Sequence, residues 1–244
     1  MHRISIRTCI IFLFWLTVWQ IVSLILHNNI ILVGPLETAK ALGTLIFTET
    51  FWNSILSSFA RIGIGFFCAF LTALCLAVLS YRFSLIEEFL NPLILLMKSI
   101  PVASFIILAL IWIGSENLSI FISASVVFPN IYINTLAGLH SADPNLLEMA
   151  QVFHFRSLSK IKYIYRPSLM PYLISASKTA LGMSWKSGVA AEVIGVPSSS
   201  IGEQLYLAKI YLSTADLFAW TVVIICISLL FETFFLWILK KCSS

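Results

Sequence analysis

Six long apolar stretches constrain the fold of this chain more than any other feature. A helix that crosses a lipid bilayer needs about 20 mostly apolar residues. Only 11% of the 244 residues are charged and 59% are hydrophobic, whereas soluble domains carry about 25% charged residues. The sequence therefore predicts an all-α, polytopic membrane protein with about six transmembrane helices, over Cys9–Leu26, Asn53–Leu79, Pro92–Ile113, Leu118–Leu139, Pro167–Val189 and Asp216–Leu239.

Two of these stretches are interrupted. The fifth contains Lys178 and Lys186, and the third contains Lys98 and Pro101. A proline inside a helix removes a backbone donor, so we expect a kink at Pro101. All six stretches are expected to form a single transmembrane domain over residues 1–244.

The distribution of cations predicts the orientation of the chain. Cytoplasmic loops of membrane proteins carry an excess of lysine and arginine, and six spans place both termini on one side. Two cations, Lys40 and Lys209, fall in loops on the other side. The side with the termini and the 140–166 loop is therefore predicted to be cytoplasmic, because it carries Arg3, Arg7, Arg82, Arg156, Lys160, Lys162, Arg166, Lys240 and Lys241.

Metal and cofactor chemistry is not indicated. The cysteines form no C-x-x-C pair and the histidines share no metal-ligand spacing. We expect no cofactor, no metal site and no nucleic-acid partner. The residues concerned are Cys9, Cys68, Cys75, Cys226 and Cys242, and His2, His27, His140 and His154.

The loop at residues 140–166 is too long and too patterned for a passive connector. Asp143 followed by Pro144 is a typical helix start, and an apolar stripe follows at Leu146, Leu147, Ala150 and Phe153. A second short helix carries Leu158, Ile161 and Ile164 on one face and is expected to end at Arg166-Pro167. One interpretation is a cytoplasmic element whose apolar stripe enters a groove on a partner, with Glu148 exposed. The other is a segment on the bilayer surface, its lysines facing anionic lipid.

The same loop resembles the cytoplasmic coupling loop of ABC importer permeases, whose pattern is E-A-A-x3-G-x9-I-x-L-P. The spacing holds throughout, and Glu148, Ala150, Ile164 and Pro167 match. Met149, His154 and Arg166 stand at the first alanine, the glycine and the leucine places. The flanks NPLILLMKSIPVASF, FPNIYINTLAGLHSADPNLLEMA and GMSWKSGVAAEVIG are similar to the nitrate, sulfonate and taurine branch, and the resemblance covers roughly residues 50–239.

The resemblance implies a type I importer permease fold with alternating access in a bacterial inner membrane. It also implies two ABC ATPase subunits at the cytoplasmic face, an extracytoplasmic solute-binding protein, and a second, usually identical permease copy. Coupling would run through Asp143, Glu148, Ala150, His154, Ile164 and Pro167. The chain has no G-x-x-x-x-G-K-[ST] loop to bind phosphates, so it is expected to be a transport subunit and not the ATPase. Nitrate, sulfonates, taurine, bicarbonate and vitamin precursors all remain open as solutes.

His154 is the departure that matters for the loop. The family's glycine permits the bend between the two helices, because glycine adopts left-handed backbone angles freely. Histidine is one of the few other residues enriched there. We therefore expect His154 to adopt a left-handed conformation. The histidine bears on how efficiently the loop couples ATP hydrolysis to transport, and not on whether the chain resembles the family.

Charges inside apolar spans are costly and are often functional. Lys98, Lys178, Lys186 and Glu192 are the candidate pathway residues, and Arg61 is a further buried charge to explain. One hypothesis is that the lysines face a wet pathway and favour an anionic solute. The alternative is that they extend to the interface or pair with Glu192 to hold the helices together.

Two other functional classes are compatible with parts of the sequence. Ser184 and Lys186, or the serines of Pro197–Ser200, suggest an intramembrane serine–lysine hydrolase. Helix positions two apart point away from each other, however, and the Pro197–Ser200 run is more typical of an external turn. A secondary transporter driven by an ion gradient would need no cytoplasmic docking helix. Co-purification of an ATPase subunit distinguishes an importer permease from both.

Overall fold

The structure, a computed structural model, describes residues 6–26, 28 and 30–243. His2, Arg3 and His27 lie outside these residues, as do the side chains of Cys9 and Cys242. The described residues form helices and no strands. In chain order they are α1 (Ile6–Leu26), α2 (Pro35–Leu45), α3 (Glu49–Arg82), α4 (Ser84–Ser99), α5 (Val102–Ile113), α6 (Leu118–His140), α7 (Pro144–Val152), α8 (Ser157–Lys160), a π-helical turn (Ile161–Tyr165), α9 (Arg166–Gly195), α10 (Ile201–Ile210) and α11 (Thr214–Ser243).

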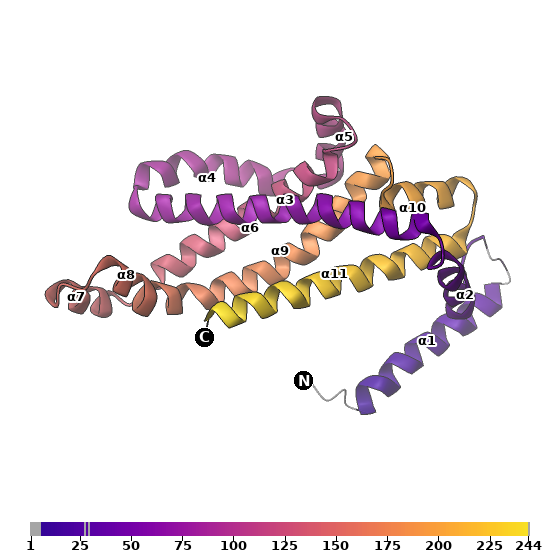
Figure 1. Cartoon of the computed structure of the whole chain (residues 1–244), viewed down its shortest axis with the longest axis horizontal. Helices are drawn as coiled ribbons and strands as arrows, with labels where there is room; N and C mark the ends of the chain where they lie inside the picture. Colours follow the sequence, from indigo (N-terminus) through magenta and orange to yellow (C-terminus); the bar gives the residue numbers. More distant parts are fainter. Residues whose placement is uncertain (1–5, 27, 29, 244) are drawn as a thin grey trace.

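The long helices α3, α6, α9 and α11 pack together as the body of the molecule (Figure 1). Helices α7 and α8 project from one end of this body, and α2 and α10 lie at the other end. The described part of α1 diverges from the bundle and contacts it near α2, where Trp19 packs on Phe218 with ring centroids 5.5 Å apart.

The core forms where these helices approach closely. Phe66 on α3 is fully buried, and its ring lies 4.9 Å from that of Phe235 on α11. Gly65 lies directly against α6, because a Cβ there would overlap Ser123 Oγ and the carbonyl oxygen of Ile120. Such small residues at helix crossings are typical of membrane bundles, in which close packing replaces the hydrophobic effect.

The predicted all-helical, membrane-spanning class is confirmed. Helices α3, α6 and α11 are each long and apolar enough to cross a bilayer, and the pair α4–α5 is a fourth candidate. Helix α9 has 30 residues, but its lysines and Glu192 interrupt the apolar sequence, and the described apolar part of α1 is the shorter segment Ile10–Leu26. By length and composition alone, crossing by α1 and α9 stays a prediction.

The third predicted stretch, 92–113, is not one kinked helix but parts of two helices. Helix α4 begins at Ser84, and it meets α5 at an angle of 108°. Proline disfavours helical angles in the residue before it, and Ile100 before Pro101 is extended, with ψ of 126°. The expected kink at Pro101 is therefore a complete break.

Candidate functional site

The loop at 140–166 folds as two short helices, and Asp143 starts the first. Its Oδ1 accepts a hydrogen bond from the Asn145 N–H at 2.9 Å, and Pro144 is the first helical residue. A side-chain oxygen at this position satisfies a backbone donor that the helix leaves free. The predicted helix start is confirmed.

His154 ends α7 in the conformation expected of a glycine. Its φ is 51°. The Phe155 N–H donates to Ala150 O at 2.9 Å, and the His154 N–H donates to Gln151 O at 3.1 Å. This pair of bonds is the Schellman motif, in which a left-handed residue closes a helix. Histidine therefore keeps the bend, with some backbone strain.

The apolar stripe of α7 divides into an inner and an outer part. Ala150 is fully buried and packs with Ile164 and Ala142, while Leu147 and Tyr165 cover this small core. The expectation that Ala150 faces a partner is wrong for this chain, because Ala150 holds α7 against the π-helical turn that precedes α9. The outer part is left exposed: Leu146, Val152, Phe153 and Leu158 are 42%, 74%, 70% and 78% exposed. Glu148 is exposed beside them.

The second short helix does not end at Arg166-Pro167 as predicted. Helix α8 passes through the π-helical turn directly into α9. The Arg166 N–H donates to Ile161 O, five residues earlier. Pro167 has no N–H and its ring crowds the carbonyl four residues before it. The wider π turn accommodates that proline, and such turns often occur at functional sites.

Two of the four candidate pathway residues lie at neighbouring cavities. Lys98 lines a cavity of about 330 Å³ and Lys186 lines one of about 370 Å³. Val102, Val126 and Met183 line both, so the cavities adjoin. Lys178 is exposed on α9, eight residues before Lys186, but is not among the residues lining either cavity.

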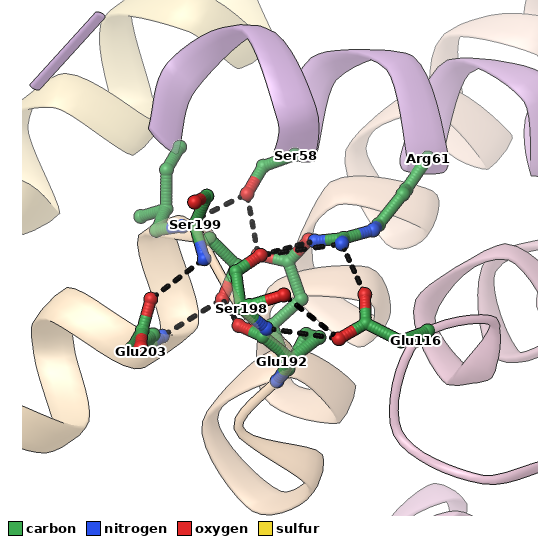
Figure 2. A network of polar contacts seen from close by, with 10 residues as sticks. Ser58, Arg61, Glu116, Glu192, Ser198, Ser199 and Glu203 are labelled. Carbon is green, nitrogen blue, oxygen red and sulfur yellow. Dashed lines mark hydrogen bonds and ion pairs between the residues drawn. The ribbon is translucent and has the colours of Figure 1, made fainter. Parts of the chain in front are cut away.

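Glu192 lies elsewhere, buried between α3, α9 and α10. The Ser58 hydroxyl donates to Glu192 Oε2 at 2.6 Å, and the Gly202 N–H donates to the same oxygen at 3.3 Å (Figure 2). The Ile201 N–H donates to Ser58 Oγ at 2.9 Å. Glu192 therefore fixes the start of α10, and the expected position on the pathway is not supported.

A second part of this polar network, which we call the end network, consists of Arg61, Glu116 and Ser198. Arg61 pairs with Glu116 at 2.5 Å and donates to Ser198 O at 3.2 Å. Glu116 Oε1 accepts from the Ser198 N–H at 3.1 Å and from its hydroxyl at 2.9 Å (Figure 2). These Ser198 bonds, together with the Arg61 charge, lower the pKa of Glu116 below its ordinary value.

The end network holds a strained turn. Val196 and Ser199 have φ of 47° and 52°, and a β-branched residue at positive φ is rare. Sequence reasoning identified the Pro197–Ser200 turn and the Arg61 charge but not their connection through Glu116. Ser184 Oγ donates to Leu181 O at 2.9 Å and Lys186 is exposed, which removes the nucleophile–base pair of the hydrolase hypothesis.

Known proteins resemble the chain over most of its length. Residues 61–242 match the family described as binding-protein-dependent transport system inner membrane component. The chain is 24% identical over 222 residues to the putative aliphatic sulfonates transport permease protein SsuC of Bacillus subtilis (strain 168), covering 90% of this chain and 80% of that protein. It is 25% identical over 220 residues to the taurine transport system permease protein TauC of Escherichia coli (strain K12), covering 88% and 80%.

A nitrate importer subunit is also similar. The chain is 26% identical over 194 residues to the nitrate import permease protein NrtB of Synechococcus elongatus, covering 74% of this chain and 68% of that protein. The family match spans well over half of the 244 residues. This chain therefore belongs to the binding-protein-dependent transport system inner membrane component family, as a multi-pass permease subunit of the nitrate, sulfonate and taurine branch of ABC importers.

Proposed function

We propose that this permease works in an ATP-driven importer in which α7 and α8 receive the motion of a separate ABC ATPase. The observation that carries the proposal is the exposed outer face of the loop, formed by Leu146, Val152, Phe153 and Leu158 beside Glu148. An apolar helical face of this kind suits a hydrophobic groove on a partner. The coupling role of Glu148 and the supporting roles of Asp143, Ala150, His154, Ile164 and Pro167 are part of this proposal.

The proposed orientation follows the cation distribution. The α7–α8 end faces the cytoplasm with both termini, and the α2–α10 end faces outward, where an extracytoplasmic solute-binding protein delivers its cargo. A second, identical copy completes the pathway, because one chain of this size encloses no passage by itself. The membrane is the bacterial inner membrane, and Lys98, Lys178 and Lys186 lie along the route of a small anionic solute.

Co-purification from native membranes tests the assembly. A tagged chain, extracted in mild detergent, is expected to bring down an ABC ATPase in near-equal amount. The double substitution Phe153→Asp and Leu158→Asp places charges on the outer face and is expected to reduce the recovered ATPase at least tenfold, since like or unpaired charges at an interface cost several kcal/mol. Recovery of the permease without any ATPase would contradict the proposal.

His154→Gly is expected to keep or raise transport-coupled ATPase activity. Relief of the left-handed strain contributes about 1 kcal/mol, and the extra freedom of glycine in the unfolded chain offsets about 0.5 kcal/mol or more of it. His154→Val is the contrasting variant, because a β-branched residue at φ near 51° adds strain. The measurement is ATPase activity of the reconstituted complex, and collapse of assembly in the glycine variant would disprove this view of the bend.

A further inference from the structure

The break between α4 and α5 opens a crevice on the α6 and α9 side of the bundle. We define the crevice as the two adjoining cavities that share Val102, Val126 and Met183. It lies away from the ends of the long helices and is open at the surface of the chain, where Lys98 and Lys186 are exposed. Lys98 is about 21 Å along α4 from Ser84 at 1.5 Å per residue, and Lys186 is about 30 Å along α9 from Arg166.

The charged groups that line the crevice are all cations. Lys98 and Lys186 carry ammonium groups, and no aspartate or glutamate is among the described residues that line either cavity. Asn134 Nδ2 donates to Asn130 Oδ1 at 3.0 Å and to Asn130 O at 2.8 Å. The Asn130 amide is thereby turned so that its own NH₂ has no partner among the described residues. Cations and amide donors without acids form a site that suits an anion.

Backbone N–H groups at the start of α5 add to the positive charge of the crevice. The first residues of α5, Val102 and Ala103, line the crevice, and α5 has no side-chain cap. The first-turn N–H groups of a helix carry partial positive charge and lack partners within the helix. Discontinuous membrane helices present their N-terminal ends to anionic groups in the same way. The two lysines are the main determinants, and the helix end reinforces them.

We propose that this crevice is a binding station for a small oxo-anion, of the sulfonate or nitrate type, during its passage through the permease. This inference rests on the proposed function and narrows it to a substrate class and a place. The volumes of about 330 and 370 Å³ admit such ions with water around them. Lys98 and Lys186 bind the oxygens, and Asn130 donates a further hydrogen bond.

A thiol placed in the shared wall measures the local charge. Met183 is 46% exposed, and Met183→Cys in a chain with its five native cysteines replaced by serine gives one reactive position. In the purified complex, a negatively charged methanethiosulfonate reagent is expected to react faster than a positively charged one, relative to a free thiol. Replacing both Lys98 and Lys186 by glutamine is expected to lower this preference about tenfold or more, given Coulomb energies near a protein surface.

Two sets of variants separate charge from structure. Lys98→Arg with Lys186→Arg keeps the charges and is expected to keep the preference. Lys209→Gln removes an exposed cation from α10, outside the crevice, and is expected to change nothing. An unchanged preference in the double glutamine variant would overturn the proposal.

Protection experiments identify the occupant. Ethanesulfonate and nitrate are expected to slow the labelling by a neutral maleimide, and choline is not. The experiment is done in detergent without added lipid and then in mixed micelles of the detergent with phosphatidylglycerol. Protection by the soluble anions alone supports a solute station. Protection by the lipid alone, or by choline equally, overturns it.

Measuring the ATPase content of the same preparation separates a failure of the crevice proposal from a failure of the coupling proposal. A complex that contains the ATPase but shows no anion preference refutes the crevice site and leaves the importer assignment standing. A preparation without ATPase refutes the coupling proposal, while the labelling ratio still decides whether the crevice favours anions.

Discussion

Gly65→Ala is expected to destabilise the folded permease strongly. The new Cβ would overlap Ser123 Oγ and the carbonyl oxygen of Ile120 on α6. The serine hydroxyl can rotate away, but the backbone oxygen cannot move without shifting the helix. Overpacking of this kind costs about 3 kcal/mol. We expect the thermal unfolding midpoint in detergent to fall by roughly 6–12 °C.

Gly63→Ala is the matched control on the same helix. Position 63 is also buried, but a Cβ there meets no atom within 4 Å. Alanine is favoured over glycine in a helix by about 1 kcal/mol, so this variant is expected to be neutral or more stable. Equal destabilisation of both variants would show that α3 and α6 are not in close contact at Gly65.

Glu148→Arg is expected to abolish coupled transport while leaving the permease folded. Glu148 is exposed, so its replacement disturbs no internal packing. In the proposed complex the carboxylate faces a basic residue of the ATPase, and arginine would place two like charges together at a cost of several kcal/mol. Each 1.4 kcal/mol corresponds to about a tenfold change. Solute uptake into proteoliposomes is therefore expected to fall about a hundredfold or more.

Glu88→Arg provides the control for charge alone. Glu88 is an exposed acid near the start of α4, at the same end of the molecule but outside the loop. Uptake by this variant is expected to stay within about twofold of the unmodified permease, as for an isolated exposed charge. Normal uptake by the Glu148 variant would remove α7 from the coupling interface, whatever the cause of the loop's exposed apolar surface.

The fold was largely predictable, because lipid imposes a simple rule on helix length and composition. The apolar sequences gave α3, α6 and α11 within a few residues. The angle between α4 and α5 at Pro101 could not be predicted from the sequence. Proline specifies that the backbone must deviate there, but the 108° angle depends on how α5 packs against α6 and α9.

The site was predictable where local chemistry decides it. The cap at Asp143 and the left-handed His154 depend on neighbouring backbone groups, and both were anticipated. The inward position of Ala150 depends on Ile164, fourteen residues later, and periodicity cannot say which apolar residues a partner will cover. The end network joins Arg61 to Glu116 and Ser198, which are 55 and 137 residues away. Nothing in the order of residues marks such a pairing.

The unbroken path from α8 through the π turn to α9 has a mechanical consequence. From Ser157 to Gly195 the backbone is continuously helical for about 58 Å at 1.5 Å per residue, with the π turn and Pro171 within it. A torque applied to the outer face of α8 would therefore tilt this whole lever arm at once, and a small rotation at one end becomes a displacement of several ångströms at Lys186. Gating in this permease would then be a rigid swing, and stiffness of the π turn would set how much of the applied stroke reaches the solute.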